Sequence, residues 1–76
     1  MKKVIIFGGC GFLGSWISKV LLEEKYDITI FDLNINKILL NIIAKNNIDK
    51  VKFIEGDITD LVQVQDVLSK ADHVIN

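Results

Sequence analysis

The chain of 76 residues has no proline and one cysteine, and its formal net charge is −1. A single cysteine excludes an internal disulfide, so we expect an intracellular protein, located in the cytoplasm. The near-zero charge excludes a strong electrostatic attraction to nucleic acid or to an anionic membrane. No apolar run approaches the roughly 20 residues of a membrane span. The sequence therefore predicts no membrane partner. No group of carboxylates or histidines has metal-ligand spacing, so it predicts no metal site either.

Half of the residues are hydrophobic and a quarter are charged, which is typical of a globular chain. Apolar runs alternate with segments of helical periodicity. We expect strands at 2–7, 26–31, 51–54 and 71–76, and helices at 12–25, 35–45 and 60–70. This alternation predicts an α/β fold with a parallel sheet and helices on both faces.

Three local features refine these boundaries. Asn46 and Asn47 are expected to end the second helix in the left-handed conformation that asparagine tolerates. Asp60, together with Thr59, is expected to cap the third helix. The fourth strand has no following segment to cover it, so we expect an exposed apolar edge and, through it, self-association.

Four of the five glycines lie between residues 8 and 14, at the turn from the first strand into the first helix. Gly8, Gly11 and Gly14 have the spacing G-x-x-G-x-x-G. In this context the first glycine permits a sharp turn, the second lets a pyrophosphate approach the backbone, and the third lets the helix pack closely on the sheet. The alternative is that the glycines only form a tight turn.

Asp32 favours a dinucleotide ligand over that alternative. It ends the second predicted strand 18 residues after Gly14, near the spacing of about 20 for a carboxylate that binds the adenosine ribose. Neither Leu33 nor Asn34 can neutralise a 2′-phosphate, which favours NAD over NADP; Lys37 is the nearest cation that could alter this preference. A P-loop is excluded because the sequence contains no G-K-[ST].

The stretches FGGCGFLGSW, IFDLN, FIEGDITD and ADHVIN together resemble the N-terminal half of an extended short-chain dehydrogenase/reductase. The resemblance is to the NAD-dependent epimerase/dehydratase family, whose members act on nucleotide sugars, and it spans the whole chain. Phe7 stands where family members commonly have threonine. The resemblance implies that residues 1–76 are a partial NAD(P)-binding Rossmann domain, an incomplete parallel sheet of strand order 3-2-1-4.

The resemblance also implies a role for individual residues. The phosphate loop would consist of Gly8, Gly11 and Gly14, with backbone N–H groups of Phe12 and Leu13 facing the pyrophosphate. The adenosine ribose would be bound by Asp32 with help from Asn34. The adenine would meet the Asp57 side chain, as acceptor from its amino group, and Ile58.

The family's catalytic Tyr-x-x-x-Lys pair is absent, because the one tyrosine, Tyr26, has isoleucine at position 30. We therefore expect no catalytic residue in these 76 residues, an inactive chain on its own, and a nucleotide-sugar substrate only for a full-length protein. The alternatives are an atypical nucleotide-binding or regulatory module and a non-functional remnant. Cys10 and His73 are expected to have no chemical role, and Trp16 is expected to pack against the sheet or an absent neighbour.

Overall fold

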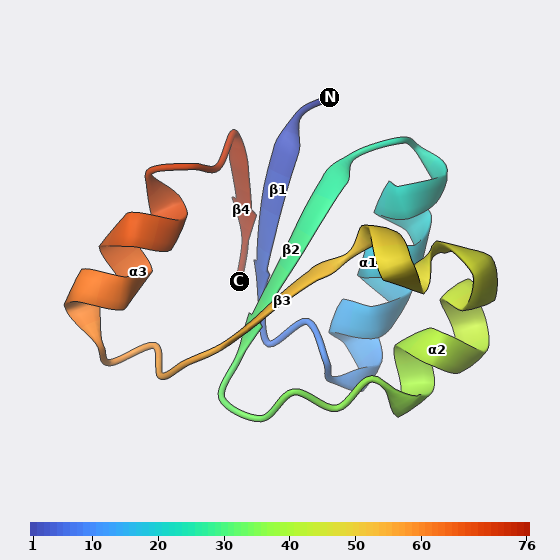
Figure 1. Ribbon diagram of the computed structural model, residues 1–76, viewed down its shortest axis with the longest axis horizontal. Coiled ribbons are helices and arrows are strands. Elements are labelled where there is room, and N and C mark those ends of the chain that lie inside the picture. Colours follow the sequence, from blue (N-terminus) through green and yellow to red (C-terminus); the bar gives the residue numbers. More distant parts are fainter.

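The computed structural model describes residues 1–76 as a four-stranded parallel sheet with helices on both faces (Figure 1). The sheet order is β3-β2-β1-β4, as the sequence predicts. In chain order the elements are β1 (Lys3–Phe7), α1 (Phe12–Glu23), β2 (Asp27–Asp32), α2 (Ile38–Ala44), a 3₁₀ helix η1 (Lys45–Lys50), β3 (Lys52–Glu55), α3 (Leu61–Leu68) and β4 (His73–Ile75).

The central strand β1 pairs with β2 on one side and with β4 on the other. Its residues Val4, Ile5 and Ile6 are all buried, which is the pattern of a strand covered on both faces. Successive side chains of a strand point to opposite faces, so this continuous apolar run contributes to two separate cores. The prediction of a doubly buried first strand is therefore confirmed.

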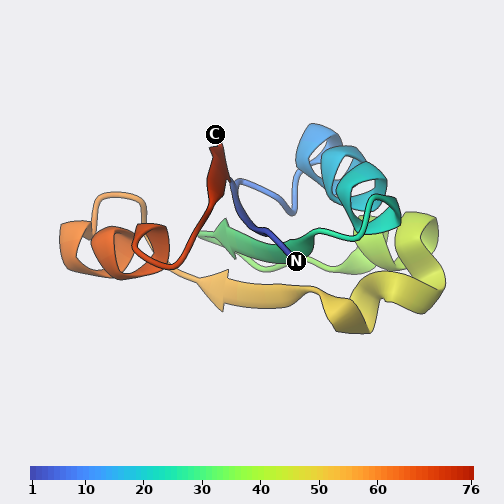
Figure 2. The same ribbon diagram turned by 90° about the horizontal axis from the view of Figure 1, so that it is seen from above.

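The helices form two layers on either side of the sheet. Figure 2 shows α1 and α2 on one side and α3 on the other. The larger core lies between the sheet and the α1–α2 layer and contains Val4, Ile6, Leu22, Ile28, Ile30, Leu40, Ala44 and Val51. The smaller core lies under α3, where Val67 packs with Ile5 and Phe31. Rossmann topology thus follows from the strand order and from the placement of the third crossover on the opposite face.

The face of α1 that touches the sheet combines two small polar residues with Leu22 of the larger core, and Ile17 and Leu21 pack against that core. Ser15 and Ser18 are fully buried, and each hydroxyl donates to a backbone carbonyl, of Gly9 (3.3 Å) and Gly14 (2.7 Å) respectively. Trp16 instead remains 41% exposed and is not part of the core, so it does not pack against the sheet. Two hydrogen-bonded serines let the helix axis approach the sheet more closely than large side chains would allow.

The second helix is shorter than its periodicity predicts. The Asn36 side chain accepts a hydrogen bond from the Ile38 backbone N–H at 3.0 Å, so α2 begins at Ile38 instead of at residue 35. At its other end, Asn46 and Asn47 do not adopt the left-handed conformation, and that prediction is wrong. The chain continues there as η1, whose Ile48 packs against the larger core.

The remaining boundaries agree closely with expectation. Asp60 caps α3 by accepting from the Gln63 backbone N–H at 3.2 Å. Val74 of the edge strand β4 is 48% exposed, as expected for a strand with one free side. None of the α-helices combines the length and the apolar character that crossing a membrane requires.

Candidate functional site

Three connections meet at the carboxyl edge of the sheet, which lies at the bottom of Figure 1. They are the glycine loop between β1 and α1, the segment between β2 and α2, and the turn between β3 and α3. Because all the strands are parallel, their carboxyl ends share one edge, and ligands of open α/β sheets bind there.

Backbone conformation or close packing requires glycine at two positions of the loop, Gly8 and Gly14. Gly8 has φ +73°, a left-handed conformation that other residues rarely adopt, and its N–H donates to the Phe31 carbonyl at 2.9 Å. A Cβ on Gly14 would lie 2.6 Å from both the Gly8 carbonyl oxygen and the Gly9 Cα. The close passage of α1 over the end of β1 therefore requires glycine at position 14.

The fold itself does not require glycine at position 11. Its φ of −72° and ψ of 176° are accessible to any residue, and an added Cβ would meet only the Gly8 carbonyl oxygen, at an ordinary 3.5 Å. The space that a side chain would occupy is open. This is the cradle expected where a ligand approaches the backbone.

The backbone N–H groups at the N-terminus of α1 have no side-chain hydrogen-bond acceptor. No side chain caps the helix and no acidic residue lies in its first turn. The first N–H groups of a helix lack intrahelical acceptors and carry a partial positive charge, so an anion placed there is stabilised. Phe12 and Leu13, whose N–H groups the resemblance assigns to the pyrophosphate, form this first turn with exposed side chains.

The Asp32 carboxylate is hydrogen-bonded to the glycine loop. Its Oδ2 accepts from the Cys10 backbone N–H at 3.1 Å, and its Oδ1 accepts from the Asn34 backbone N–H at 3.3 Å. Each carboxylate oxygen has two acceptor sites, so both oxygens can accept a further hydrogen bond from ribose hydroxyls. The two bonds hold the carboxylate beside the loop before any ligand arrives.

Asp57 is held by the residue two positions later. Its Oδ1 accepts from the backbone N–H of Thr59 at 2.9 Å and from the Thr59 hydroxyl at 2.8 Å. These two hydrogen bonds lower the pKa of Asp57 below its usual value of 3.8. The side chain is therefore an ionised acceptor at neutral pH.

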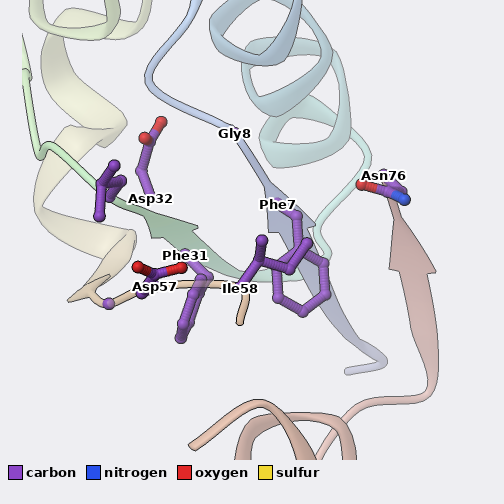
Figure 3. Close-up of a pocket in the computed structure, with 9 residues that line it drawn as sticks. Phe7, Gly8, Phe31, Asp32, Asp57, Ile58 and Asn76 are labelled. Carbon is purple, nitrogen blue, oxygen red and sulfur yellow. The ribbon is translucent and has the colours of Figure 1, made fainter. Parts of the chain in front are cut away.

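A pocket of about 300 Å³, the carboxyl-edge pocket, opens between these connections (Figure 3). It brings together four of the predicted site residues, Gly8, Asp32, Asp57 and Ile58. Figure 3 shows the two carboxylates on one side of the pocket and Asn76 on the other. The other predicted residues do not line it: Gly11, Phe12, Leu13 and Gly14 form the adjacent start of α1, and Asn34 contributes its N–H to Asp32.

Five residues that line the pocket escaped prediction as site residues: Phe7, Phe31, Leu33, Gly56 and Asn76. Each lies at or just beyond the carboxyl end of a strand, which is the signal that could have identified them. Gly56 has its own steric reason, because a Cβ there would lie 2.6 Å from Cζ of Phe31. Phe7 and Phe31 contact each other with ring centroids 5.2 Å apart, and they give the pocket an aromatic floor.

Cys10 lies in the glycine loop with its side chain partly buried. Burial raises the pKa of its thiol, an effect opposed by a hydrogen bond from the Asn36 backbone and by the charge of Lys37, and reinforced by the charge of Asp32. A thiol of this kind is a poor nucleophile at neutral pH. His73, the other residue expected to have no chemical role, is exposed at the start of β4.

The chain is similar in sequence and in fold to known proteins. The profile of the 3-beta hydroxysteroid dehydrogenase/isomerase family matches residues 5–76. The uncharacterized protein 052L of frog virus 3 (isolate Goorha) is 34% identical over 100% of this chain and 21% of its own length. A UDP-glucose 4-epimerase of Klebsiella pneumoniae is 32% identical over 96% of this chain and 52% of its own length.

Among solved structures, the UDP-Glc/GlcNAc 4-epimerase of Campylobacter jejuni matches 97% of this chain and 23% of its own, with a TM-score of 0.79 and 27% identity. The chain thus spans between about a fifth and a half of the length of the relatives it matches. The family profile covers almost every residue, including the glycine loop, Asp32 and the turn at Asp57. The chain therefore belongs to the 3-beta hydroxysteroid dehydrogenase/isomerase family, among the epimerase/dehydratase-type short-chain dehydrogenases/reductases.

Proposed function

We propose that residues 1–76 form the first half of a Rossmann domain and bind the adenosine and pyrophosphate part of NAD at the carboxyl edge of the sheet. The observation that carries this proposal is the open space at Gly11. The fold itself would accept a side chain there, since the nearest atom to a Cβ is 3.5 Å away. A glycine that the fold does not require, beside an uncapped helix N-terminus, fits a bound diphosphate.

The residues around this space fit the rest of the ligand. Asp32 is fixed by the Cys10 N–H at 3.1 Å, and it retains acceptor sites for the ribose hydroxyls. The carboxyl-edge pocket has apolar surface from Phe31 and Ile58, together with the Asp57 carboxylate, which suits a flat base that carries an amino group. Gly8, Gly14, Phe12, Leu13 and Asn34 complete the proposed binding set.

NAD is preferred over NADP in this proposal. A 2′-phosphate would bring negative charge against Asp32, and the neighbouring Leu33 and Asn34 carry no positive charge to offset it. The Lys37 ammonium lies 4.5 Å from the centroid of the Phe53 ring, and this cation–π contact would compete with a 2′-phosphate for it.

For the whole protein we propose a nucleotide sugar as substrate, as in the epimerases among its relatives. NAD bound in such a protein would supply a hydride acceptor for the oxidation of a substrate alcohol, in which the hydride leaves the carbon that bears the hydroxyl group. The residues of this chain bind and orient the cofactor. Tyr26 precedes β2 and so lies at the amino edge of the sheet, opposite the carboxyl-edge pocket, where it cannot act on the same ligand.

The test is a thermal melt of the chain with and without NAD, followed by calorimetric titration. A ligand that binds only the folded state raises the melting temperature by mass action. We expect NAD to raise it, and NADP at the same concentration to raise it less. A melt that NAD leaves unchanged at millimolar concentration would contradict the proposed function.

A further inference from the structure

A second pocket, also of about 300 Å³, lies between α3 and the amino-terminal half of the sheet. This amino-edge pocket shares no lining residue with the carboxyl-edge pocket. The smaller core separates the two: Ile5 and Val67 line the amino-edge pocket, whereas Phe31, which packs with both, lines the carboxyl-edge pocket. Its volume falls at the lower end of the range of small-molecule sites. The proposed binding of NAD leaves this pocket unused.

The register of the strands builds the floor of the amino-edge pocket. Ile5, Thr29 and Lys52 form one row across β1, β2 and β3. Paired residues of neighbouring strands point to the same face, and Ile5 packs with Val67 of α3, so the row faces α3. Ile54, two residues after Lys52, points to the same face. The floor is therefore aliphatic, apart from the hydroxyl of Thr29.

That hydroxyl is a polar group available to a ligand. None of the hydrogen bonds made by side chains of the chain involves Thr29. A hydroxyl group can donate one hydrogen bond and accept two. It can therefore bind a polar group that enters the pocket alongside apolar atoms.

The rim of the amino-edge pocket has three lysines, Lys3, Lys52 and Lys70, and one carboxylate, Asp66. The Lys70 ammonium lies 3.4 Å from Asp66, and the Lys52 ammonium lies 3.8 Å from Asp27. Both lysine side chains are about two-thirds exposed, at 66% and 67%. Exposed ion pairs of this kind stabilise a protein very little, so each ammonium can turn to an anion in the pocket at small cost.

We propose that the amino-edge pocket binds an aliphatic carboxylate, with its hydrocarbon chain on Ile5, Ile54 and Val67 and its carboxylate among the lysine ammonium groups. The apolar floor alone would accept a neutral hydrocarbon, and the lysines alone would attract any anion. Lysine stems can lie along apolar surface while their charged ends remain in water. The pocket therefore selects a molecule that is apolar at one end and negatively charged at the other. This second site does not depend on the binding of NAD.

Titrations followed by the NMR shifts of backbone amides test the inference, with hexanoate, acetate and hexan-1-ol as probes at constant ionic strength. We expect hexanoate to bind about tenfold or more tightly than acetate, which lacks the hydrocarbon chain. Hexan-1-ol lacks the charge, and we expect it to bind about threefold or more weakly than hexanoate. The amides that shift should be those of Ile5, Thr29, Ile54 and Val67. Equal affinities for the three probes, or shifts confined to other residues, would overturn the inference.

Thr29→Ile fills the floor of the pocket. Thr29 is partly buried in a strand, where a β-branched side chain is favourable, so we expect the melting temperature to be retained. Binding of both hexanoate and hexan-1-ol should be lost. If the variant binds hexanoate as the wild type does, the anion is attracted only by lysines at the surface, and the proposed site is wrong.

A pair of double variants tests the charge without changing the floor. Lys52→Gln with Lys70→Gln should lower the affinity for hexanoate to that for hexan-1-ol. The matched control, Lys19→Gln with Lys45→Gln, removes the same charge from α1 and from the end of α2, on the opposite face of the sheet. It should retain the affinity for hexanoate; equal losses in the two double variants would contradict a specific site.

Titration of the wild-type chain with NAD separates this inference from the proposed function. The two pockets have no lining residue in common, so NAD should not displace hexanoate. A chain that binds NAD but not hexanoate contradicts this inference alone. A chain that binds hexanoate but not NAD contradicts the proposed function alone.

Discussion

Substitution of Gly11 by valine separates the requirements of the fold from those of a ligand. The backbone at Gly11 is extended, with φ −72° and ψ 176°, and the nearest atom to a new Cβ is 3.5 Å away. Restricting the unfolded chain at this position stabilises by about 0.4–1 kcal/mol. Losing glycine at a helix N-cap destabilises by a similar amount. We therefore expect the free energy of unfolding to change by no more than about 1 kcal/mol.

The same substitution should remove most of the affinity for NAD. A phosphate oxygen that accepts from a backbone N–H lies about 2.9 Å from the nitrogen, and the isopropyl group of valine would occupy the space it needs. A decrease in affinity of at least tenfold corresponds to about 1.4 kcal/mol. Calorimetric titration measures this decrease, and circular dichroism melts measure the stability of the same samples.

Gly14→Ala is the matched control. Its Cβ would lie 2.6 Å from the Gly8 carbonyl oxygen and from the Gly9 Cα, so the helix must shift, and we expect a loss of about 1–3 kcal/mol in stability. In a domain of this size, 1 kcal/mol lowers the melting temperature by about 4–8 °C. If Gly11→Val binds NAD within twofold of wild type, the loop does not receive the phosphates. If it melts as low as Gly14→Ala does, the space at Gly11 is not open.

Three further predictions concern neighbouring residues. Asp32→Ala should weaken NAD binding by about 1–3 kcal/mol through loss of a charge-assisted hydrogen bond, and a calorimetric affinity equal to wild type would exclude Asp32 as the ribose ligand. Lys37→Ala should leave the ratio of NAD to NADP affinities unchanged, since its ammonium lies over the Phe53 ring; a shift toward NAD would show instead that Lys37 reaches the 2′-phosphate. Because burial raises the pKa of Cys10 above the usual 9.0, its thiolate fraction at pH 7.5 is smaller than that of free cysteine. Iodoacetamide should therefore modify Cys10 more slowly than it modifies glutathione, with a rate that still increases above pH 9; equal rates at pH 7.5 would contradict this.

The helix α1 shows where periodicity is a poor guide to burial. Its large apolar residues recur at helical spacing, yet Phe12, Trp16 and Val20 are 74%, 41% and 54% exposed, whereas Ser15 and Ser18 are buried. Periodicity reveals that a helix forms, but the distance between the helix and the sheet determines which face can be buried. Gly14 brings the start of α1 close to the end of β1, where Ser15 and Ser18 are buried, whereas the large Leu22 is buried near the other end of the helix.

The second helix gives a related lesson about boundaries. The Ile38 backbone N–H donates to the Asn36 side-chain oxygen, and this competing hydrogen bond delays the start of α2. Beyond its end the chain forms a 3₁₀ helix, in which the partly buried Ile48 packs against the larger core. Such competition involves a single side chain or a tertiary contact. It leaves no trace in the apolar pattern from which helix ends are predicted.

The sequence by itself determined the order of the elements and the position of the glycine loop and Asp32 at strand ends. Those features depend on local periodicity, on backbone sterics and on the handedness of crossovers, all of which act within short stretches of chain. Only the tertiary structure decided that Phe7, Phe31 and Asn76 line one pocket, and that Thr59 holds Asp57. The pocket joins the ends of separate strands, and the turn depends on the orientation of one hydroxyl group; both are set by packing in three dimensions.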